Sequence, residues 1–470
     1  MYISVFVNRI DIRTQDVVSF TRPLGFIPFS QSAGIMFTLG GVVANHVHGG
    51  TYTRGFLYED VEALRVMLAN GEVRELQRGG DGEMKHWLGS FGLLGIITGV
   101  RLHLEKKAIV MDNVSKSFAA EGMWTKEKVM GWIRRQRART YAGGFFLNPW
   151  NKSFLMLRWK EVEGDPVLEA GASYEDALAE MKADYAELES KASTVRYTGT
   201  IVGNTVELLA RTDELAEDIQ TVMPVASAIT STVFSLLMDR ANEAQNVMDG
   251  YYLHDAPKGD YMTGIMPAEY EWEIINSLMQ FHENRTADPE SDYYSHGPLE
   301  FRYITVADDV ATLQEVPAGE YITAEVFSVK LAGAYAYARH FSALEQRWVQ
   351  EFNMKPHLGK EYGYCQPDDG KTDFFVPFCD KNITRGIFTS EQKTLFENYR
   401  SSVDPAQLFY AGGAVELVDD DCETGFEWRN REGQRCDLFG YGDTICQEGS
   451  ACEPTDDGIT SICTRLASEE

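Results

Sequence analysis

Apolar and polar residues alternate along several stretches of the chain, and these patterns predict short strands separated by turns. Residues 61–69 and 72–76 form two such stretches, joined by Asn70-Gly71. Both residues of this dipeptide tolerate positive φ, so the pattern predicts a β-hairpin with a type I′ turn. Further strands are expected at residues 96–104, 155–159, 299–306 and 321–329.

Other stretches carry apolar residues at helical spacing. Residues 334–353 have the pattern of an amphipathic helix. Further helices are expected at residues 82–90, 174–190, 205–218 and 267–283. Residues 220–238 carry no formal charge and approach the length of a membrane span. They include Pro224 and six hydroxyl residues, which favours a buried helix of a soluble domain over a span.

The charge balance narrows the classes of partner. The chain has 470 residues, with 43 Lys and Arg against 71 Asp and Glu, which gives a net charge of −28. Such an acidic protein repels phosphate backbones and anionic lipid, so neither nucleic acid nor a membrane surface is an expected partner. The length allows two to four domains.

The seven cysteines all lie in the C-terminal part of the chain, and none precedes Cys365. Five fall in a final stretch that is poor in apolar residues: Cys422, Cys436, Cys446, Cys452 and Cys463. This predicts a small disulfide-stapled module and a secreted protein, because disulfides need an oxidising compartment. Five is odd, so one tail cysteine pairs with Cys365 or Cys379, or stays free. No paired C-x-x-C occurs, which disfavours zinc.

Other targeting signals disagree with one another. Four N-x-[ST] sequons agree with secretion and glycosylation: Asn113, Asn151, Asn284 and Asn382. The first twenty residues, in contrast, carry charges where a signal peptide has its apolar core. Secretion therefore remains an expectation that the tail and the sequons support and the N-terminal residues do not.

The segment TLGGVVANHVHGG, residues 38–50, is the first candidate for chemistry. Paired glycines, small apolar residues and His48-Gly49 follow one another. Such a segment lets backbone N–H groups approach a pyrophosphate closely, although a plain tight turn in a sheet has the same composition. His46 and His48 would share one face of a strand, but no third ligand is evident nearby, so no metal site is expected.

Three shorter segments carry further candidates. Gly92-Leu-Leu-Gly95 leads into a strand and fits a turn before a core strand. Glu300 and Arg302 share one face of a strand, either as an ion pair facing solvent or as a polar pair inside a pocket. Lys360 follows a Gly turn, either as a solvated residue or as a cation beside a flavin.

In this order the segments resemble the vanillyl-alcohol-oxidase (PCMH-type) superfamily of FAD flavoproteins. They are most similar to its sugar-lactone and alditol oxidases, such as the D-arabinono-1,4-lactone and L-gulonolactone oxidases. The resemblance rests on Thr38 to Gly49, the hairpin with Asn70-Gly71, Gly92 to Thr98, Glu300-x-Arg302, His357-Leu-Gly-Lys360 and Asp404-Pro405 to Phe409. The family has Trp where this chain has Leu358.

The resemblance implies an α+β fold. Residues 1–110 would be the C-terminal part of a PCMH-type FAD-binding domain. Residues 111–345 would form a substrate-binding cap domain with a large antiparallel sheet flanked by helices, and residues 346–418 would complete the cap and the flavin site. Residues 419–470 would be the Cys-rich module.

The resemblance also implies a reaction and its residues. Hydride would pass from a hydroxyl-bearing carbon of a sugar lactone, alditol or similar polyol to flavin N5, with O2 as the acceptor that gives H2O2. Glu300 would accept a hydroxyl hydrogen bond, while Arg302 and Lys360 would stabilise reduced flavin. The residues expected to contact FAD are Gly40, Gly41, Val42, Asn45, His46, Val47, His48, Gly49, Gly95, Ile97 and His357.

Two departures from the family pattern are informative. The family's G-x-G-H-S segment, whose His often bonds flavin covalently, occurs nowhere in the chain, and only 37 residues precede Thr38. A missing N-terminal flavin-binding part, as in a truncated gene model, is therefore expected, with FAD bound non-covalently or by residues absent from this chain. Truncation would also account for a lost signal peptide. The rival hypothesis is a non-catalytic secreted binding scaffold or a truncated pseudoenzyme.

Overall fold

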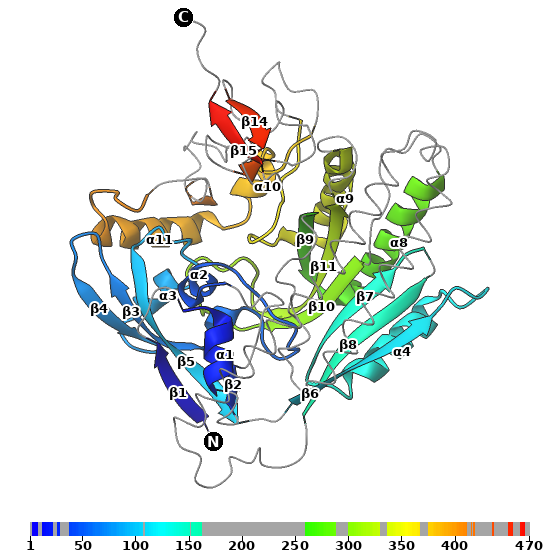
Figure 1. The fold of residues 1–470 in the computed structure, drawn as a ribbon, viewed down its shortest axis with the longest axis horizontal. Helices are drawn as coiled ribbons and strands as arrows, with labels where there is room; N and C mark the ends of the chain where they lie inside the picture. Colours follow the sequence, from blue (N-terminus) through cyan, green and yellow to red (C-terminus); the bar gives the residue numbers. More distant parts are fainter. Residues whose placement is uncertain are drawn as a thin grey trace, which may run out of the picture.

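The computed structural model describes most of the chain outside residues 162–258 and the C-terminal region. The described residues are 2–7, 12–21, 26–28, 37–106, 109–150, 152–161, 259–287, 299–329, 336–366, 375–410, 415, 417–418, 435–436, 450–454 and 461–465. Two sheets dominate them, one on each side of the molecule in Figure 1. The fold is α+β, as predicted.

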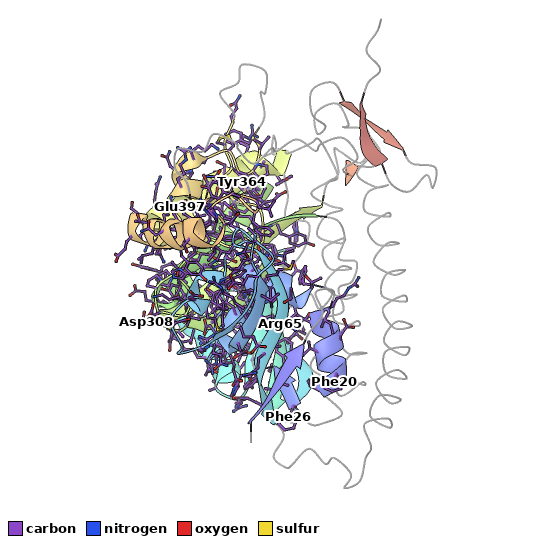
Figure 2. All side chains as sticks on the ribbon, turned by 90° about the vertical axis from the view of Figure 1, so that its left-hand side faces the viewer. Phe20, Phe26, Arg65, Asp308, Tyr364 and Glu397 are labelled. Atoms are coloured by element: carbon purple, nitrogen blue, oxygen red, sulfur yellow. A yellow bond between two sulfur atoms is a disulfide. The ribbon has the colours of Figure 1, made fainter. Side chains whose placement is uncertain are left out.

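The first sheet is antiparallel and is built around one long strand, β5 (Ile96–Lys106). The described strands that complete it are β1 (Tyr2–Val7), β2 (Phe26–Pro28), β3 (Val61–Met67) and β4 (Val73–Gln77). The short helices near it are α1 (Thr14–Thr21), α2 (Leu39–Ala44), η2 (Leu57–Asp60) and α3 (Met84–Trp87). The side view of Figure 2 places Phe20 and Phe26 at the end of the molecule opposite Tyr364 and Glu397.

The predicted hairpin is present as β3 and β4, but the predicted turn type is wrong. Gly71 has φ +82°, whereas Asn70 is not among the residues with positive φ. Leu68 exchanges two backbone hydrogen bonds across the loop, donating to Glu72 and accepting from Gly71. This makes a three-residue loop with only its last residue in the left-handed region. The Asn70 side chain accepts the N–H of Glu72 at 2.9 Å, so it stabilises the loop without adopting positive φ.

The second sheet is antiparallel and has seven described strands in the order β12-β9-β11-β10-β7-β8-β6. Their bounds are β6 (Ile109–Ser117), β7 (Ala142–Asn148), β8 (Ser153–Glu161), β9 (Gly259–Pro267), β10 (Leu299–Val306), β11 (Gly319–Val329) and β12 (Lys355–Pro356). The strands expected at 155–159, 299–306 and 321–329 are confirmed within it, as is the large antiparallel sheet of the cap.

Helices cover one face of the second sheet: α4 (Lys126–Arg137), α8 (Glu271–Ala287, preceded by η4, Ala268–Tyr270) and α9 (Ala336–Phe352). Phe301 and Tyr303 of β10 point into the core beneath these helices. Ile304 and Val306 of the same strand point into the other core, which contains the first sheet. The second sheet therefore separates two hydrophobic cores, and its helix-free face lies toward the first sheet.

Most of the predicted helices that fall on described residues are confirmed. The structure has α3 within 82–90, α8 across most of 267–283 and α9 within 334–353. The stretches 174–190, 205–218 and 220–238 lie outside the described residues. None of the helices described is both long enough and apolar enough to cross a membrane.

The C-terminal part contains a disulfide and a small sheet. Cys365 and Cys379 bond to each other, so the alternative in which a tail cysteine takes one of them is wrong. The remaining described elements are α10 (Lys381–Arg385), α11 (Ser390–Val403), β13 (Arg435–Cys436), β14 (Ser450–Pro454) and β15 (Ser461–Arg465). Cys452 and Cys463 stand opposite each other in the β14–β15 register. The Asp404 carboxylate ends α11 by accepting the backbone N–H groups of Leu408 and Phe409.

Candidate functional site

The segment of residues 38–50 runs from the first sheet to the second, and glycines make the junction. The backbone N–H of Gly143 on β7 donates to the carbonyl of Gly50 at 3.0 Å, and Thr51 forms a β-bridge with Ala142. A Cβ on Gly50 would lie 3.1 Å from the Gly143 carbonyl oxygen and 3.8 Å from Cδ of Arg302. The junction thus brings the end of the Gly-rich segment against Arg302.

The start of this segment is a short helix rather than the expected turn or loop. Thr38 is the N-cap of α2, and its hydroxyl accepts the N–H of Gly41. A Cβ on Gly41 would lie 2.9 Å from that hydroxyl oxygen, so a side chain there would require the Thr38 hydroxyl to shift. Gly40 packs on Ile97, since its Cβ would lie 3.7 Å from Cβ of Ile97. The structure therefore brings the start of the Gly-rich segment against Ile97. The family resemblance had assigned both segments to FAD binding without placing them in contact.

Gly95 precedes Ile97 and has a backbone that only glycine accommodates. Its φ is +148°, and a Cβ would lie 2.5 Å from the Met67 carbonyl oxygen and 2.9 Å from the Trp87 ring. The predicted turn before a core strand is therefore present at the start of β5. Ile97 itself pairs with Val66 of β3 and is half-buried.

His48 and His357 meet in the space between the two sheets. Their ring centroids are 4.8 Å apart, and both side chains are buried. The Nδ1 of His48 lies 2.9 Å from the carbonyl oxygen of Gly49, and the Nδ1 of His357 accepts the N–H of Gly359. Burial, reinforced by Arg302, lowers the pKa of His48 to about 4, and burial also holds the pKa of His357 well below its usual value.

His46 lies apart from this pair, inside the core of the first sheet. Its ring is fully buried and stacks on Phe91 at 5.2 Å between centroids. Its Nδ1 lies 3.3 Å from Oε2 of Glu315, which is also fully buried. Burial lowers the pKa of His46 to about 3 and raises that of Glu315 well above its usual value. His46 is therefore neutral near pH 7, and any cofactor contact of His46 would come from its backbone.

The remaining residues expected at the cofactor differ in exposure. Val42 and Gly49 are both buried. Asn45 and Val47 are half-buried, and the Asn45 side chain donates to the Gly41 carbonyl at 2.8 Å. Since small residues and backbone line this segment, it offers N–H groups and shape rather than charge.

Glu300, Arg302 and Lys360 come together on the helix-free face of the second sheet. Oε1 of Glu300 accepts from Nε of Arg302 at 2.5 Å and also pairs with Nη2. Nζ of Lys360 lies 3.2 Å from Oε2 of Glu325 on β11 and 4.6 Å from the centroid of the Tyr261 ring. Thr263 on β9 donates its hydroxyl to the same Glu325 oxygen at 2.8 Å. Two acids, two cations and the Thr263 hydroxyl thus form one cluster across three strands and a loop.

This geometry decides between the alternatives that the sequence left open. The side chains of Glu300 and Arg302 are only 15% and 10% exposed, so the pair is largely buried and does not lie on a solvent face. Lys360 is 34% exposed and is held in the cluster rather than fully solvated. A turn places it there, because its N–H donates to the carbonyl of His357, whose own N–H donates to Thr263.

Sequence reasoning missed Glu325. No motif surrounds this residue, and its alternating strand pattern is common to many surface acids. The signal that could have found it is register. Once β10 and β11 pair as neighbours, Glu325 stands directly opposite Glu300.

The residues present fit FAD on the side that the structure describes. The N-capped helix with Gly40 and Gly41 leaves backbone uncovered, and a side chain on Gly41 would fill that space. Arg302 and Lys360 supply the positive charge that a reduced flavin would need. The described residues hold no group of three or more His, Cys, Asp or Glu arranged to bind a metal.

The buried histidines lead to a prediction about stability. The usual histidine pKa of 6.5 falls to about 3 for His46 and about 4 for His48 on folding. The unfolded chain therefore binds more protons below pH 6.5, and the free energy of unfolding should fall as the pH is lowered. At about pH 5 each histidine should cost about 2 kcal/mol. Urea unfolding at about pH 7 and pH 5 measures this loss of stability. The loss should be smaller in the His46→Phe variant. A free energy of unfolding that is the same at both pH values would contradict the prediction.

Comparisons with known proteins give a family and a fold. Residues 175–416, just over half of the chain, match the family described as D-arabinono-1,4-lactone oxidase. That match includes Glu300, Arg302, Glu325 and Lys360. No curated protein matches the sequence.

Solved structures of cholesterol oxidases share the fold. A solvent-stable cholesterol oxidase is 13% identical with a TM-score of 0.59, over 86% of this chain and 80% of that one. Two structures of the cholesterol oxidase from Brevibacterium sterolicum, one a histidine-to-alanine mutant, are 14% identical. Their TM-scores are 0.60 and 0.61, over 88% of this chain and 81% of theirs.

Proposed function

The chain belongs to the D-arabinono-1,4-lactone oxidase family, and we propose that it oxidises a hydroxyl group of a sugar lactone, an alditol or a similar polyol. Membership of this family, together with the oxidase fold, makes it an FAD-dependent oxidoreductase of the PCMH type. The observation that carries the proposal is the cluster of Glu300, Arg302 and Lys360, which lies beside His48 of the Gly-rich segment.

Different residues of the chain would hold the cofactor, stabilise negative charge and contact the substrate hydroxyl. Bound FAD would supply a hydride acceptor at N5 of its ring. The segment from Gly40 to Gly49, with Gly95, Ile97 and His357, would hold the cofactor. Arg302 and Lys360 stabilise negative charge that develops beside them, and the burial of Arg302 strengthens its effect. Glu300 accepts a hydrogen bond from the substrate hydroxyl and tunes the loss of its proton.

The proposal extends to the acceptor and to the attachment of the cofactor. O2 would reoxidise the flavin and yield H2O2. The two histidines of the Gly-rich segment would not link to FAD covalently, because both rings already pack against other side chains. His46 is enclosed by aromatic rings, and His48 packs on His357. Acid precipitation should therefore release the flavin into the supernatant.

Flavin content and flavin reduction test the proposal. The protein, purified with FAD, should show the blue absorption band of bound flavin. Under anaerobic conditions, a polyol or sugar lactone should bleach this band. Glu300→Gln and Lys360→Ala should slow bleaching about 10-fold to 100-fold, since each removes one polar group from the reacting centre. Glu320→Gln, at an exposed position of β11, is the control, and its flavin should be reduced at the parental rate.

Two results would count against the proposal. Absence of a flavin band after loading with FAD would favour the binding-scaffold alternative. Parental bleaching rates in both Glu300→Gln and Lys360→Ala would show that this cluster is not the reacting centre. Thermal unfolding of each variant shows whether a slow rate reflects chemistry or loss of the fold.

A further inference from the structure

Glu300 and Glu325 face each other across neighbouring strands. They are register partners in the β10–β11 pairing, and Thr263 of β9 is the partner of Glu325 on its other side. Like charges directly opposite each other destabilise a sheet. Two buried acids at such a position are therefore a costly arrangement, which the surrounding cations must offset.

The two carboxylates are held by different partners. Oε1 of Glu300 takes both contacts from Arg302, whereas Oε2 of Glu325 takes the Lys360 ammonium and the Thr263 hydroxyl. These contacts engage one oxygen of each acid, and the side chains of Glu300 and Glu325 remain 15% and 16% exposed.

The surroundings of the two acids favour opposite protonation states. Burial raises the pKa of Glu300, and the charge of Glu325 adds to this effect against the opposing Arg302. Burial acts in the same direction on Glu325, but Lys360, Arg302 and the Thr263 hydroxyl outweigh it and lower its pKa. His48, which lies in the Gly-rich segment, is neutral near pH 7 and adds no charge. Two neighbouring acids whose pKa values are shifted in opposite directions take different roles in a site.

We propose that Glu325 is a further catalytic residue, the carboxylate that takes the proton of the substrate hydroxyl. In that step the substrate O–H bond breaks and the proton joins Oε1 of Glu325. The O–H electron pair forms the carbonyl as hydride leaves the same carbon for the flavin. Glu300, held by Arg302, orients the hydroxyl without taking its proton. This inference rests on the proposed function for its substrate and its oxidant.

The first test follows stability against pH and needs neither substrate nor turnover. A carboxylate that is stabilised in its ionised form supports the fold above pH 4.5 and loses that support as the pH falls. Glu325→Gln should therefore lower the unfolding midpoint in urea most near pH 7 and progressively less toward pH 4. Glu300→Gln should show the opposite trend. The same trend in both variants would overturn the assignment of the two acids.

The second test follows the acid limb of flavin reduction. In the holoenzyme, Glu325→Gln should lower the rate by about 100-fold and abolish the fall of the rate at low pH. Glu300→Gln should keep that fall. Thr263→Val, which removes one hydrogen bond to Glu325, should move the acid limb to higher pH while keeping the fold. An acid limb that persists in Glu325→Gln and vanishes in Glu300→Gln overturns the inference.

These tests separate the inference from the function on which it rests. If no polyol or lactone reduces the flavin of the parent protein, the proposed function fails, while the stability trends still judge the roles of the two acids. If the parent turns over and Glu325→Gln does so at the parental rate, the proposed function stands and Glu325 has no catalytic part. Glu320→Gln on the same strand is the matched control in both tests.

Discussion

Replacing Arg302 with leucine is expected to slow flavin reduction by about 1000-fold, near the upper end for loss of one charged donor at a reacting centre. The variant also leaves Glu300 and Glu325 facing each other with Lys360 as the remaining cation of the cluster. Removing one partner of a buried ion pair typically destabilises a protein by about 3–5 kcal/mol, so the unfolding midpoint should fall as well. Stopped-flow bleaching and urea unfolding measure the two effects.

A conservative substitution at position 302 separates the effect of charge from that of geometry, and a second arginine serves as the control. Arg302→Lys keeps the charge but loses the planar fork that meets Glu300 with two nitrogens, so its rate should lie between those of the parent and the leucine variant. Arg65→Leu, on an exposed position of β3, should change neither quantity by more than experimental error. A leucine variant at position 302 with the parental rate would remove Arg302 from the reacting centre.

The parts of the fold that depend on local pattern were predictable from sequence. Strand β10 occupies the expected residues 299–306, and α9 lies within the expected amphipathic stretch. Period-two alternation also placed Glu300 and Arg302 on one face. These predictions succeed because side-chain periodicity is set by the element itself and needs no knowledge of its neighbours.

The parts that depend on tertiary pairing were not predictable. Whether the Glu300–Arg302 pair faces solvent or is buried depends on what lies against the sheet, and here Gly50 of the Gly-rich segment lies against Arg302. Glu325 joins the site only through the β10–β11 register, which one sequence does not specify. The turn at Asn70-Gly71 failed for a related reason, since loop length is fixed by the register of the two strands.

Substituting valine at Gly143 is expected to destabilise the protein by about 3 kcal/mol or more, because the site has no room for a side chain. A Cβ there would lie 2.5 Å from Oη of Tyr52, 2.9 Å from Cε of Met156 and 3.0 Å from the Leu157 carbonyl oxygen. The backbone N–H of Gly143 also makes the bond to Gly50 that joins the Gly-rich segment to the second sheet. Displacing that junction should therefore weaken FAD binding together with the fold.

Gly131→Ala on α4 is the matched control for Gly143→Val, since its Cβ would meet only the end of the Arg135 side chain at 3.4 Å. Alanine is favoured over glycine within a helix by about 0.5–1 kcal/mol, so this variant should be as stable as the parent or slightly more so. Urea unfolding and the flavin content after purification measure both variants. Parental stability and flavin content in Gly143→Val would show that the junction between the sheets adapts, and that close glycine contact is not what positions the Gly-rich segment beside Arg302.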